Sequence, residues 1–523
     1  MHVITRPVSF FELYLPAIRS FFMFRSFVIF FLFIYPFALK SQILPLEGSS
    51  LNYRIIGFSA PLLSHTENYQ LEIALGYYNT EDSFKKNIIK TFSAKNNKII
   101  AEVPLFGKEY TWRAKYVGAH SSNITGDLHH FSTKMNPCVD TSLFRLRILK
   151  NAEEYKDAFV FLDDSKVMYD MKGNPVWFLP PVDGIQITPR DIKLSPEGTI
   201  TLLFNPPYEV NYNGAVLWKA PMKGVVSGDY NENCHHEFTR LKNGHYMVLG
   251  IEYMLWKQDA PYPQDTIPFN PTSTDSVYKK TPFGTIIEYD EKGNVVWSWK
   301  SSRYFRTSDL KYFRTDQGSD IVDAHENAFF FDEKNKFIYV SFKNISRIIK
   351  VKYPEGTVVS SYGENYKPGV PQKGNGLFCG QHACNISRKG YLYMFNNNIC
   401  NTGELPKITV LEEPHSSKDS LKKIWEYECT IEGVSESERK AQRFISGGSV
   451  QELPDGSIFA CMNGTYSKIF IVNPDKKILW SGLAEKWNAN EKKWEMSGQY
   501  RSYIVYDKEK LEQLIWNAAD KKQ

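Results

Sequence analysis

The chain has 523 residues, enough for one large domain with a smaller one beside it and for an ample hydrophobic core. Aromatic residues make up 15% of it, a composition that favours β-strands. The formal net charge is +5, and most of it comes from residues 1–42. The rest of the chain is nearly balanced and therefore indicates no nucleic-acid partner.

The N-terminal segment, residues 1–42, has the pattern of an export signal. Arg25 precedes an unbroken apolar run from Phe27 to Leu39, and small and polar residues follow it. The run is too short to span a bilayer comfortably but suits the apolar part of a signal peptide. It predicts a periplasmic protein without stable membrane association after cleavage, with an uncleaved anchor as the alternative.

Residues 43–137 are expected to form a small β-sandwich. The stretches "YQLEIALGYYN", "NKIIAEVP" and "KEYTWRAKYVG" alternate apolar and polar residues, as half-buried strands do. This pattern favours an immunoglobulin-like or fibronectin-like domain. The stretch "STKMNPCVD" is the expected linker to the second domain, residues 138–523.

From about residue 150 onward, two β units alternate along the chain. The first is a turn followed by an apolar strand that often ends on Trp, as in "YDMKGNPVWF", "YDEKGNVVWSW" and "NPDKKILW". Its Asp, Asn and Gly residues tolerate the positive φ of a tight hairpin. The second is a strand, a turn and an apolar strand, as in "RDIKLSPEGTITLLF" and "HACNISRKGYLYMF".

Six alternations of these units predict an all-β fold, a six-bladed β-propeller with four strands per blade around a central channel. The sixth copy of the second unit is faint, around "YRSYIVY". A β-sandwich array and a β-solenoid are the alternatives. Sandwiches would not keep one residue in register across units, and solenoid repeats are shorter.

The second unit supplies the innermost strand of each blade, so residues at one register of it converge at the mouth of the channel. Its leading position reads Arg190, His236, His325, His382 and Gly448, with Tyr500 or Arg501 in the sixth copy. Three histidines at one register, in a chain with 11 histidines, indicate a functional site. The neighbouring His235 is expected to point the other way on the strand.

Three converging imidazoles could hold a metal with open positions, or could bind an anionic group and attack it. Asn327 follows His325 by two residues and therefore shares its strand face. Lys343, on the next strand, brings a cation. An ammonium group is unfavourable beside a dication and stabilising beside an oxyanion, so the set favours an anion and neither a metal nor another cofactor.

At this point the sequence resembles a known family. The stretches "HHEFTRLKNGHYMVLG", "DAHENAFFFDEKNKFIYVSFKN" and "GQHACNISRKGYLYMFNNN", in this order, are similar to the bacterial arylsulfate sulfotransferases. Those proteins are periplasmic six-bladed propellers preceded by a small β-sandwich. The resemblance covers nearly the whole mature chain. It implies sulfuryl transfer from small phenyl sulfate donors to phenolic acceptors, without a nucleotide, by a ping-pong route through a sulfohistidine.

Carried over residue by residue, the resemblance implies that His382 is the nucleophile and that His325 and His236 are catalytic partners. It also implies substrate-binding roles for Asn327, Lys343 and Ser446, and the register of the sixth inner strand adds Arg501 to this set. Lys343 stands where the family has an arginine, so the charge is kept and the bidentate fork is lost. Arg347 could substitute for that arginine, and Ser446 is the candidate for a family hydroxyl near the fifth inner strand.

The seven cysteines are an odd set for an exported protein. Cys379 and Cys384 flank His382 and could form a small disulfide loop in an oxidising compartment. The family resemblance does not support this pair, because the family's small disulfide loop lies upstream of the nucleophile.

Two long insertions, residues 256–284 and 364–378, are candidate lids or substrate walls, and Tyr262 or Phe269 could stack on an aryl ring. Two alternative functions stay open: a propeller that only binds a ligand or partner, and a metal-dependent hydrolase with three histidine ligands. A homodimer is implied by the family alone, since no residue pattern indicates an interface.

Overall fold

The computed structural model describes residues 43–62, 66–118, 124–257, 267–268, 278–305, 324–363, 377–399, 405–416, 418–431, 446–463 and 467–519. The predicted signal segment lies outside these ranges. Within them, no helix is both long enough and apolar enough to cross a membrane.

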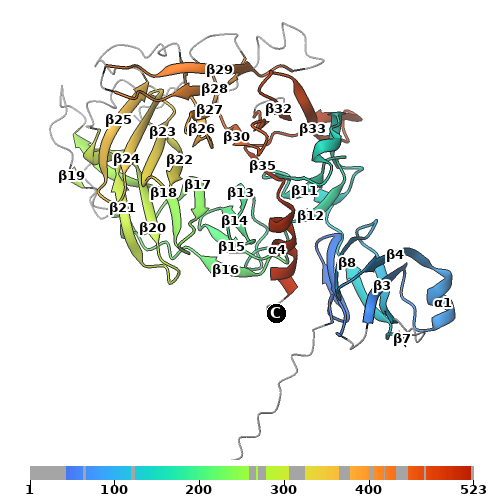
Figure 1. Ribbon diagram of the computed structural model, residues 1–523. Helices are drawn as coiled ribbons and strands as arrows, with labels where there is room; N and C mark the ends of the chain where they lie inside the picture. Colours follow the sequence, from blue (N-terminus) through green and yellow to red (C-terminus); the bar gives the residue numbers. More distant parts are fainter. Residues whose placement is uncertain are drawn as a thin grey trace, which may run out of the picture. The chain divides into compact units, whose positions relative to one another are not determined.

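Six antiparallel sheets, each built on a path of four strands, form the blades of a six-bladed β-propeller (Figure 1). The first contains β10 (Phe159–Leu162), β11 (Val167–Asp170), β12 (Pro175–Phe178) and the C-terminal β35 (Ser502–Val505). The second contains β13 (Arg190–Leu194), β14 (Ile200–Leu203), β15 (Tyr208–Val210) and β16 (Val216–Lys219). The third contains β17 (His235–Arg240), β18 (Tyr246–Lys257), β20 (Tyr278–Tyr289) and β21 (Val295–Lys300), with β19 (Ile267–Pro268) beside β18.

The other three sheets follow the same plan. The fourth contains β22 (Glu326–Asp332), β23 (Phe337–Phe342), β24 (Arg347–Lys352) and β25 (Thr357–Gly363). The fifth contains β26 (His382–Ile386), β27 (Leu392–Asn396), β28 (Lys407–Glu412) and β29 (Lys422–Glu428). The sixth contains β30 (Ser449–Glu452), β31 (Ile458–Cys461), β32 (Lys468–Val472) and β33 (Ile478–Asn488), with β34 (Lys493–Met496) and β9 (Phe144–Lys150) beside β33.

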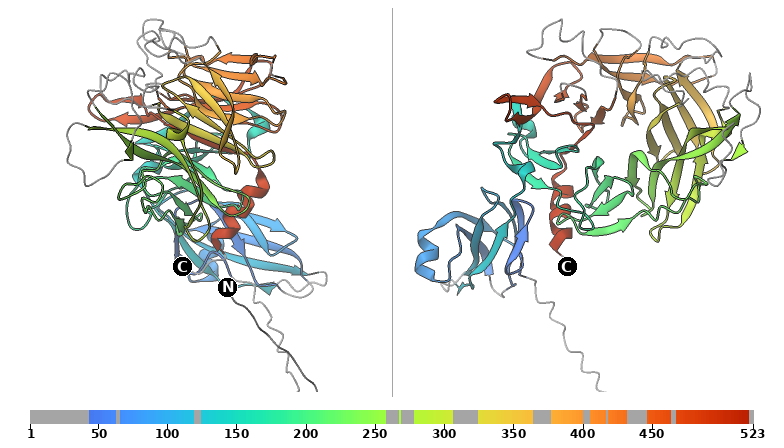
Figure 2. Two further views of the ribbon diagram at one scale, coloured as in Figure 1. Left: turned by 90° about the vertical axis from the view of Figure 1, so that its left-hand side faces the viewer. Right: turned by 180° about the vertical axis from the view of Figure 1, so that it is seen from behind.

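The innermost strands form a closed ring. Contacts run from β13 to β17, β22, β26, β30 and β35, and from β35 back to β13. The right-hand view in Figure 2, from behind, shows the sheets around the axis in the order of their colours. The ring closes because β35, near the C-terminus, pairs with β10, so the first blade is built from both ends of the propeller chain. The predicted propeller and its faint sixth repeat are confirmed.

Repeated tryptophans join four of the blades to the blade that follows. On four outer strands, the indole Nε1–H donates to a backbone carbonyl in the last turn of the following blade. The pairs are Trp177 with Tyr212, Trp297 with Pro354, Trp425 with Pro474, and Trp480 with Met171, at 2.7–2.9 Å. The last pair joins the sixth blade to the first. The bonds of Trp177 and Trp480 are buried, where an indole N–H needs an acceptor, so at these two positions the Trp repeat follows from the packing of blades.

The turn before each tryptophan also has a physical cause. Asp170 accepts from the backbone N–H groups of Lys172 and Asn174, and Gly173 takes a φ of 85°. Asp290 and Gly293 repeat this arrangement in the third blade. The Asp side chain closes the turn, and glycine supplies the left-handed residue.

Two sheets precede the propeller. The larger runs in the order β1 (Ser49–Leu51), β8 (His129–Thr133), β6 (Glu109–Gly118), β3 (Thr66–Leu75) and β4 (Ile88–Ala94), with β7 (Ile124–Thr125) beside β6. The smaller pairs β2 (Ile55–Ser59) with β5 (Lys98–Glu102). These sheets do not establish an immunoglobulin-like or fibronectin-like sandwich, which stays a prediction. The helical segments are α1 (Glu81–Lys86), α4 (Lys508–Ala519), and the 3-10 turns η1 (Pro137–Val139), η2 (Glu153–Tyr155) and η3 (Ser301–Arg303).

The N-terminal sheets share a hydrophobic core with the propeller. Tyr53 stacks on Tyr212 with ring centroids 4.2 Å apart and forms a β-bridge to Trp177. Helix α4 contacts both β2 and β35, and a Cβ on Gly57 of β2 would lie 2.8 Å from the Trp516 ring. The hydrophobic core therefore continues from the N-terminal sheets into the propeller. The division into two domains at residue 137 stays a prediction.

Candidate active site

The inner strands share an irregularity where they begin. In β13, β17, β22 and β26 the ladder shifts register within the first few residues. Left-handed backbone accompanies each shift, at Asp191, His236, His325 and Ala383. Non-glycine residues rarely adopt this conformation, and bulges of this kind redirect side chains near functional sites. The histidines are therefore presented by bulges at the strand starts and not by regular β backbone.

His382 is the most enclosed of the three predicted histidines, with 1% of its surface exposed. Its Nδ1 lies 2.7 Å from Oδ1 of Asn397, and its Nε2 lies 3.1 Å from the backbone nitrogen of Gly447. The Gly447 N–H can only donate, so Nε2 carries the lone pair. Nδ1 therefore carries the proton and donates it to Asn397.

His236 and His235 contact each other directly. Their Nδ1 atoms are 2.7 Å apart, and Nε2 of His235 lies 3.2 Å from the Gly250 carbonyl oxygen. That oxygen only accepts, so His235 donates through Nε2 and, when neutral, accepts at Nδ1. His236 then carries its proton on Nδ1 and a lone pair on Nε2. The expectation that His235 points away from the site is wrong, because the bulge in β17 brings both rings together.

The remaining rings complete the cluster. The His325 ring lies 5.0 Å from that of His236, edge to face. The Tyr500 ring lies 6.0 Å from His236 and 6.4 Å from His382. Burial raises the pKa of Tyr500 to about 12, against the nearby positive charges of Arg501 and Arg190. The register argument thus correctly brought His236, His325, His382 and Tyr500 into one cluster.

Burial, helped by nearby charges, keeps the imidazoles of His382 and His236 neutral. Burial is the largest cause that lowers the pKa of His382 well below 6.5, and the ammonium group of Lys343 is the next. Burial also lowers the pKa of His236 well below its usual value, helped by His235, His325 and Arg501. A neutral imidazole near pH 7 is the form that can act as a nucleophile or a base.

Arg501 occupies a different position from the one predicted for a substrate ligand. Its guanidinium donates to Asp191 at 2.9 Å and to Glu237 at 2.7 Å, and also to the Asn327 carbonyl oxygen at 2.9 Å. Burial opposes its charge, but Glu237 and then Asp191 raise its pKa. Lys193 pairs with the same two carboxylates, so the cluster holds two positive and two negative groups. The charge of Arg501 reaches the histidines, while its donors are directed at carboxylates.

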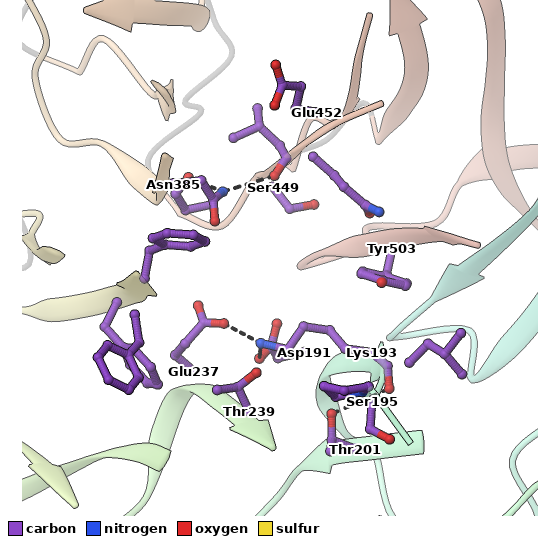
Figure 3. A pocket seen from close by; sticks show the side chains of 18 of the residues that line it. Asp191, Lys193, Ser195, Thr201, Glu237, Thr239, Asn385, Ser449, Glu452 and Tyr503 are labelled. Atoms are coloured by element: carbon purple, nitrogen blue, oxygen red, sulfur yellow. Dashed lines mark hydrogen bonds and ion pairs between the residues drawn. The ribbon is translucent and has the colours of Figure 1, made fainter. Parts of the chain in front are cut away.

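The ion cluster borders a cavity of about 560 Å³ on the channel axis (Figure 3). Residues of the inner strands line this cavity, among them Lys193, Thr239, Asn385, Ser449 and Tyr503. In the part of the chain that the structure describes, none of the three histidines lines it. The cavity and the histidine cluster are thus separate parts of the channel.

The other predicted substrate ligands lie around the histidines. The Asn327 amide donates to the carbonyl oxygen of Gln381 at 2.8 Å, directly before His382. Its Oδ1 has no hydrogen-bond partner among the described residues. The exposed Ser446 precedes Gly447, and its hydroxyl lies 3.5 Å from the Asn463 amide. Arg347 accepts from the Gln381 side chain through its backbone oxygen.

Two further sequence predictions have different outcomes. Cys379 is disulfide-bonded, whereas Cys384 is a free, buried thiol that lies 3.7 Å from the Tyr339 carbonyl oxygen. The predicted Cys379–Cys384 pair is therefore wrong. Tyr262 and Phe269 lie outside the described residues, so their stacking on an aryl ring stays a prediction.

Sequence reasoning missed the residues that hold the histidines in place. Asn397 and Gly447 contact both nitrogens of His382 between them, and His235 contacts His236. The "NNN" run after β27 and the "GG" before β30 were the only signals for the first two. Over the described ranges, no group of three or more His, Cys, Asp or Glu side chains is arranged to hold a metal ion.

The sequence matches a model of one protein family, described as arylsulfotransferase (ASST), over residues 146–506. This range is more than half of the chain and contains the whole histidine cluster. No curated protein is similar enough in sequence to match.

Solved structures resemble this chain only remotely. A protein of unknown function from Bacteroides caccae has 12% sequence identity and a TM-score of 0.37, and covers 70% of this chain and 100% of its own. An auxiliary nutrient binding protein from Bacteroides ovatus has 10% identity and a TM-score of 0.33, and covers 88% of this chain and 90% of its own. The Cps50 (Swd1) β-propeller domain of Myceliophteria thermophila has 8% identity and a TM-score of 0.28, over 56% of this chain and 85% of its own.

Proposed function

Because the chain belongs to the arylsulfotransferase family, we propose that it transfers a sulfuryl group from an aryl sulfate ester to a phenolic acceptor in two steps, through a sulfohistidine at His382. The family accounts for a sulfotransferase of small aryl substrates. The ping-pong route and the identity of the nucleophile are the parts proposed here.

The state of the His382 ring carries this proposal. The ring is buried and neutral. Its Nδ1 carries the proton, and its Nε2 carries the lone pair. In the first step this lone pair attacks sulfur. The N–S bond forms while the bond between sulfur and the aryl oxygen breaks, and the phenolate leaves with the bonding electron pair.

In the second step the acceptor phenol attacks the same sulfur. Its oxygen forms the new S–O bond, the N–S bond breaks, and the lone pair returns to Nε2 of His382. The phenol proton goes to a neighbouring imidazole. His236 is suited to this role, because its Nε2 lone pair faces away from His235, and the adjacent His325 is the second candidate.

Charge on the three sulfuryl oxygens requires donors that are already in place. Lys343 lies near enough to His382 to lower its pKa and would hold the anionic sulfate group. The Gly447 N–H, now 3.1 Å from Nε2, loses its acceptor when Nε2 bonds to sulfur, and a sulfuryl oxygen is then its nearest new acceptor. Asn327 and Ser446 remain candidate ligands at the rim of this site.

The test uses the purified protein with 4-nitrophenyl sulfate, with and without phenol, and the intact mass of the protein in parallel. His382→Ala removes the nucleophile, and His415→Ala is the matched control, because the His415 side chain is 81% exposed. Nitrophenol release that depends on phenol, with one added SO₃ in the wild type and in the control but not in His382→Ala, is the expected result. Without release or adduct the proposal fails. Release abolished by a chelator would favour a metal-dependent hydrolase.

We also propose that the protein acts in the periplasm, since residues 1–42 carry the pattern of an export signal. Fractionation of expressing cells and sequencing of the mature N-terminus test this. An uncleaved chain in the membrane fraction would favour the anchor instead.

A further inference from the structure

Asn397 lies directly behind the proposed nucleophile and belongs to no set of residues that the sequence pointed to. We propose that Asn397 is a positioning residue that holds His382 in the tautomer with a free Nε2 lone pair, and that its neutral amide keeps the sulfated ring able to pass the group on. The second half of this inference rests on the proposed function; the first half does not.

Three hydrogen bonds connect His382, Asn397 and Gly447 in a closed loop. The Asn397 amide nitrogen donates to the Gly447 carbonyl oxygen at 3.1 Å, and its Oδ1 lies 2.7 Å from Nδ1 of His382. The Gly447 N–H donates to Nε2 at 3.1 Å. Since the Gly447 carbonyl only accepts and its N–H only donates, one arrangement of protons satisfies all three contacts. The Gly447 carbonyl oxygen orients the Asn397 amide, and the Asn397 Oδ1 and the Gly447 N–H together favour one tautomer of His382.

The loop has little freedom to rearrange. His382 is 1% exposed and Asn397 is 2% exposed. Gly447 has a φ of 65°, and a Cβ there would lie 2.6 Å from the Asn463 amide nitrogen and 2.7 Å from the Tyr500 carbonyl oxygen. If this arrangement changed, the buried Asn397 amide would lose hydrogen bonds that water cannot replace. That cost stabilises the arrangement.

The neighbouring asparagines do different work. Asn396 accepts through Oδ1 from the backbone N–H groups of Cys379 and Asn398. Asn398 has a φ of 56° and donates to the Leu405 carbonyl oxygen at 3.2 Å. Both stabilise the loop after β27, whereas Asn397 is the member of the run that contacts the imidazole. Asn398 is therefore a matched control from the same segment.

The charge of residue 397 matters after the first step. When Nε2 bonds to sulfur, the proton on Nδ1 remains, so the ring becomes formally cationic. A carboxylate at this position would stabilise that cation and weaken the tendency of the sulfuryl group to leave. The amide oxygen accepts the Nδ1 proton without cancelling the charge. Asp191 and Glu237, the carboxylates of the ion cluster, are already paired with Arg501 and Lys193. The imidazole of the sulfated His382 therefore remains a good leaving group.

The first experiment measures the resting protein and needs no turnover. Nitrogen-15 NMR of histidine-labelled full-length protein, with His382 assigned by the loss of its signals in His382→Gln, reports which ring nitrogen carries the proton. The expected result is protonated Nδ1 and unprotonated Nε2 in the wild type and in Asn398→Gly. A mixture of tautomers is expected in Asn397→Leu. Protonated Nε2 in the wild type, or an unchanged tautomer in Asn397→Leu, would overturn the proposal.

The second experiment follows the two half-reactions by rapid quenching and intact mass. Asn397→Leu is expected to slow sulfation of His382 by about 10- to 100-fold, as expected when a residue that orients a histidine is removed. Asn397→Asp is expected to become sulfated but to pass the group to phenol at least ~10-fold more slowly, so the adduct accumulates. Equal transfer rates in Asn397→Asp and the wild type would refute the charge argument. Absence of any adduct in the wild type would sink the proposed function and leave the tautomer result standing.

Discussion

Replacing Arg501 tests whether this side chain binds substrate or holds the channel together. Arg501→Met removes the guanidinium that lies 2.9 Å from Asp191 and 2.7 Å from Glu237. At an effective dielectric constant of about 20, each contact represents a gross attraction of about 6 kcal/mol. Much of that is offset by desolvation, and breaking a buried pair from one side costs about 3–5 kcal/mol. Lys193 still contacts both carboxylates, so we expect the lower end of this range, about 3 kcal/mol.

The measurement is the free energy of unfolding in urea, followed by tryptophan fluorescence, at pH 8 and at pH 5. In the variant the two buried carboxylates share one cation, Lys193, so one negative charge is not balanced and the pKa of one carboxyl in the folded state rises above its value in the unfolded chain. Its contribution to stability is present at low pH and is lost as the pH rises through the folded pKa. The deficit relative to the wild type should therefore be larger at pH 8 than at pH 5.

A second substitution provides the control for this reasoning. Arg501→Met combined with Glu237→Gln removes one charge of each sign and leaves Lys193 paired with Asp191, so it should recover at least half of the lost stability. A variant Arg501→Met that unfolds like the wild type, but needs much more aryl sulfate for half-maximal rate, would refute the ion-pair role. That result would restore Arg501 as a substrate ligand.

Three further predictions concern other contacts. Lys343→Met should raise the pKa of His382, because Lys343 is the charged group that lowers it most. The acid limb of the sulfation rate should then move to higher pH. Lys343→Arg should leave that limb in place, and pH profiles of single turnovers distinguish the two variants. His235→Phe removes the acceptor of His236 Nδ1, so transfer to phenol should slow more than sulfation of His382, which quenched-flow analysis of both steps measures. Trp480→Phe loses the 2.9 Å hydrogen bond that joins the last blade to the first, and should lower the free energy of unfolding by about 1 kcal/mol beyond the loss of packing. Trp297→Phe, whose indole bond is exposed, is the control. An equal effect of the two substitutions would argue against a special role of Trp480 in closing the ring.

Much of the fold could be predicted from the sequence because the repeat is chemical as well as periodic. Asp-Gly turns precede two of the outer strands and tryptophans recur on several of them, and hydrogen bonds in the structure explain both features. The predictions failed where the backbone departs from regular β geometry. His235 was expected to face away by alternation, but the bulge in β17 brings it against His236. Arg501 was expected by register to bind substrate; the structure shows its guanidinium paired with acidic side chains from two other blades, and the substrate-binding role stays a prediction.

The sequence by itself determined the architecture and the chemistry of the cluster: two alternating β units, histidines at one register of the second unit, and a nearby lysine. Any closed ring of blades brings residues at one register of the repeat together, so this much follows from the chain alone. The tertiary structure alone decided how each histidine acts. The tautomer of His382 depends on Asn397 and on the backbone of Gly447, which lies 65 residues away in the next blade. Such contacts have no periodic signal, because they arise where bulged strands and loops from different blades meet, and only the closed ring establishes those meetings.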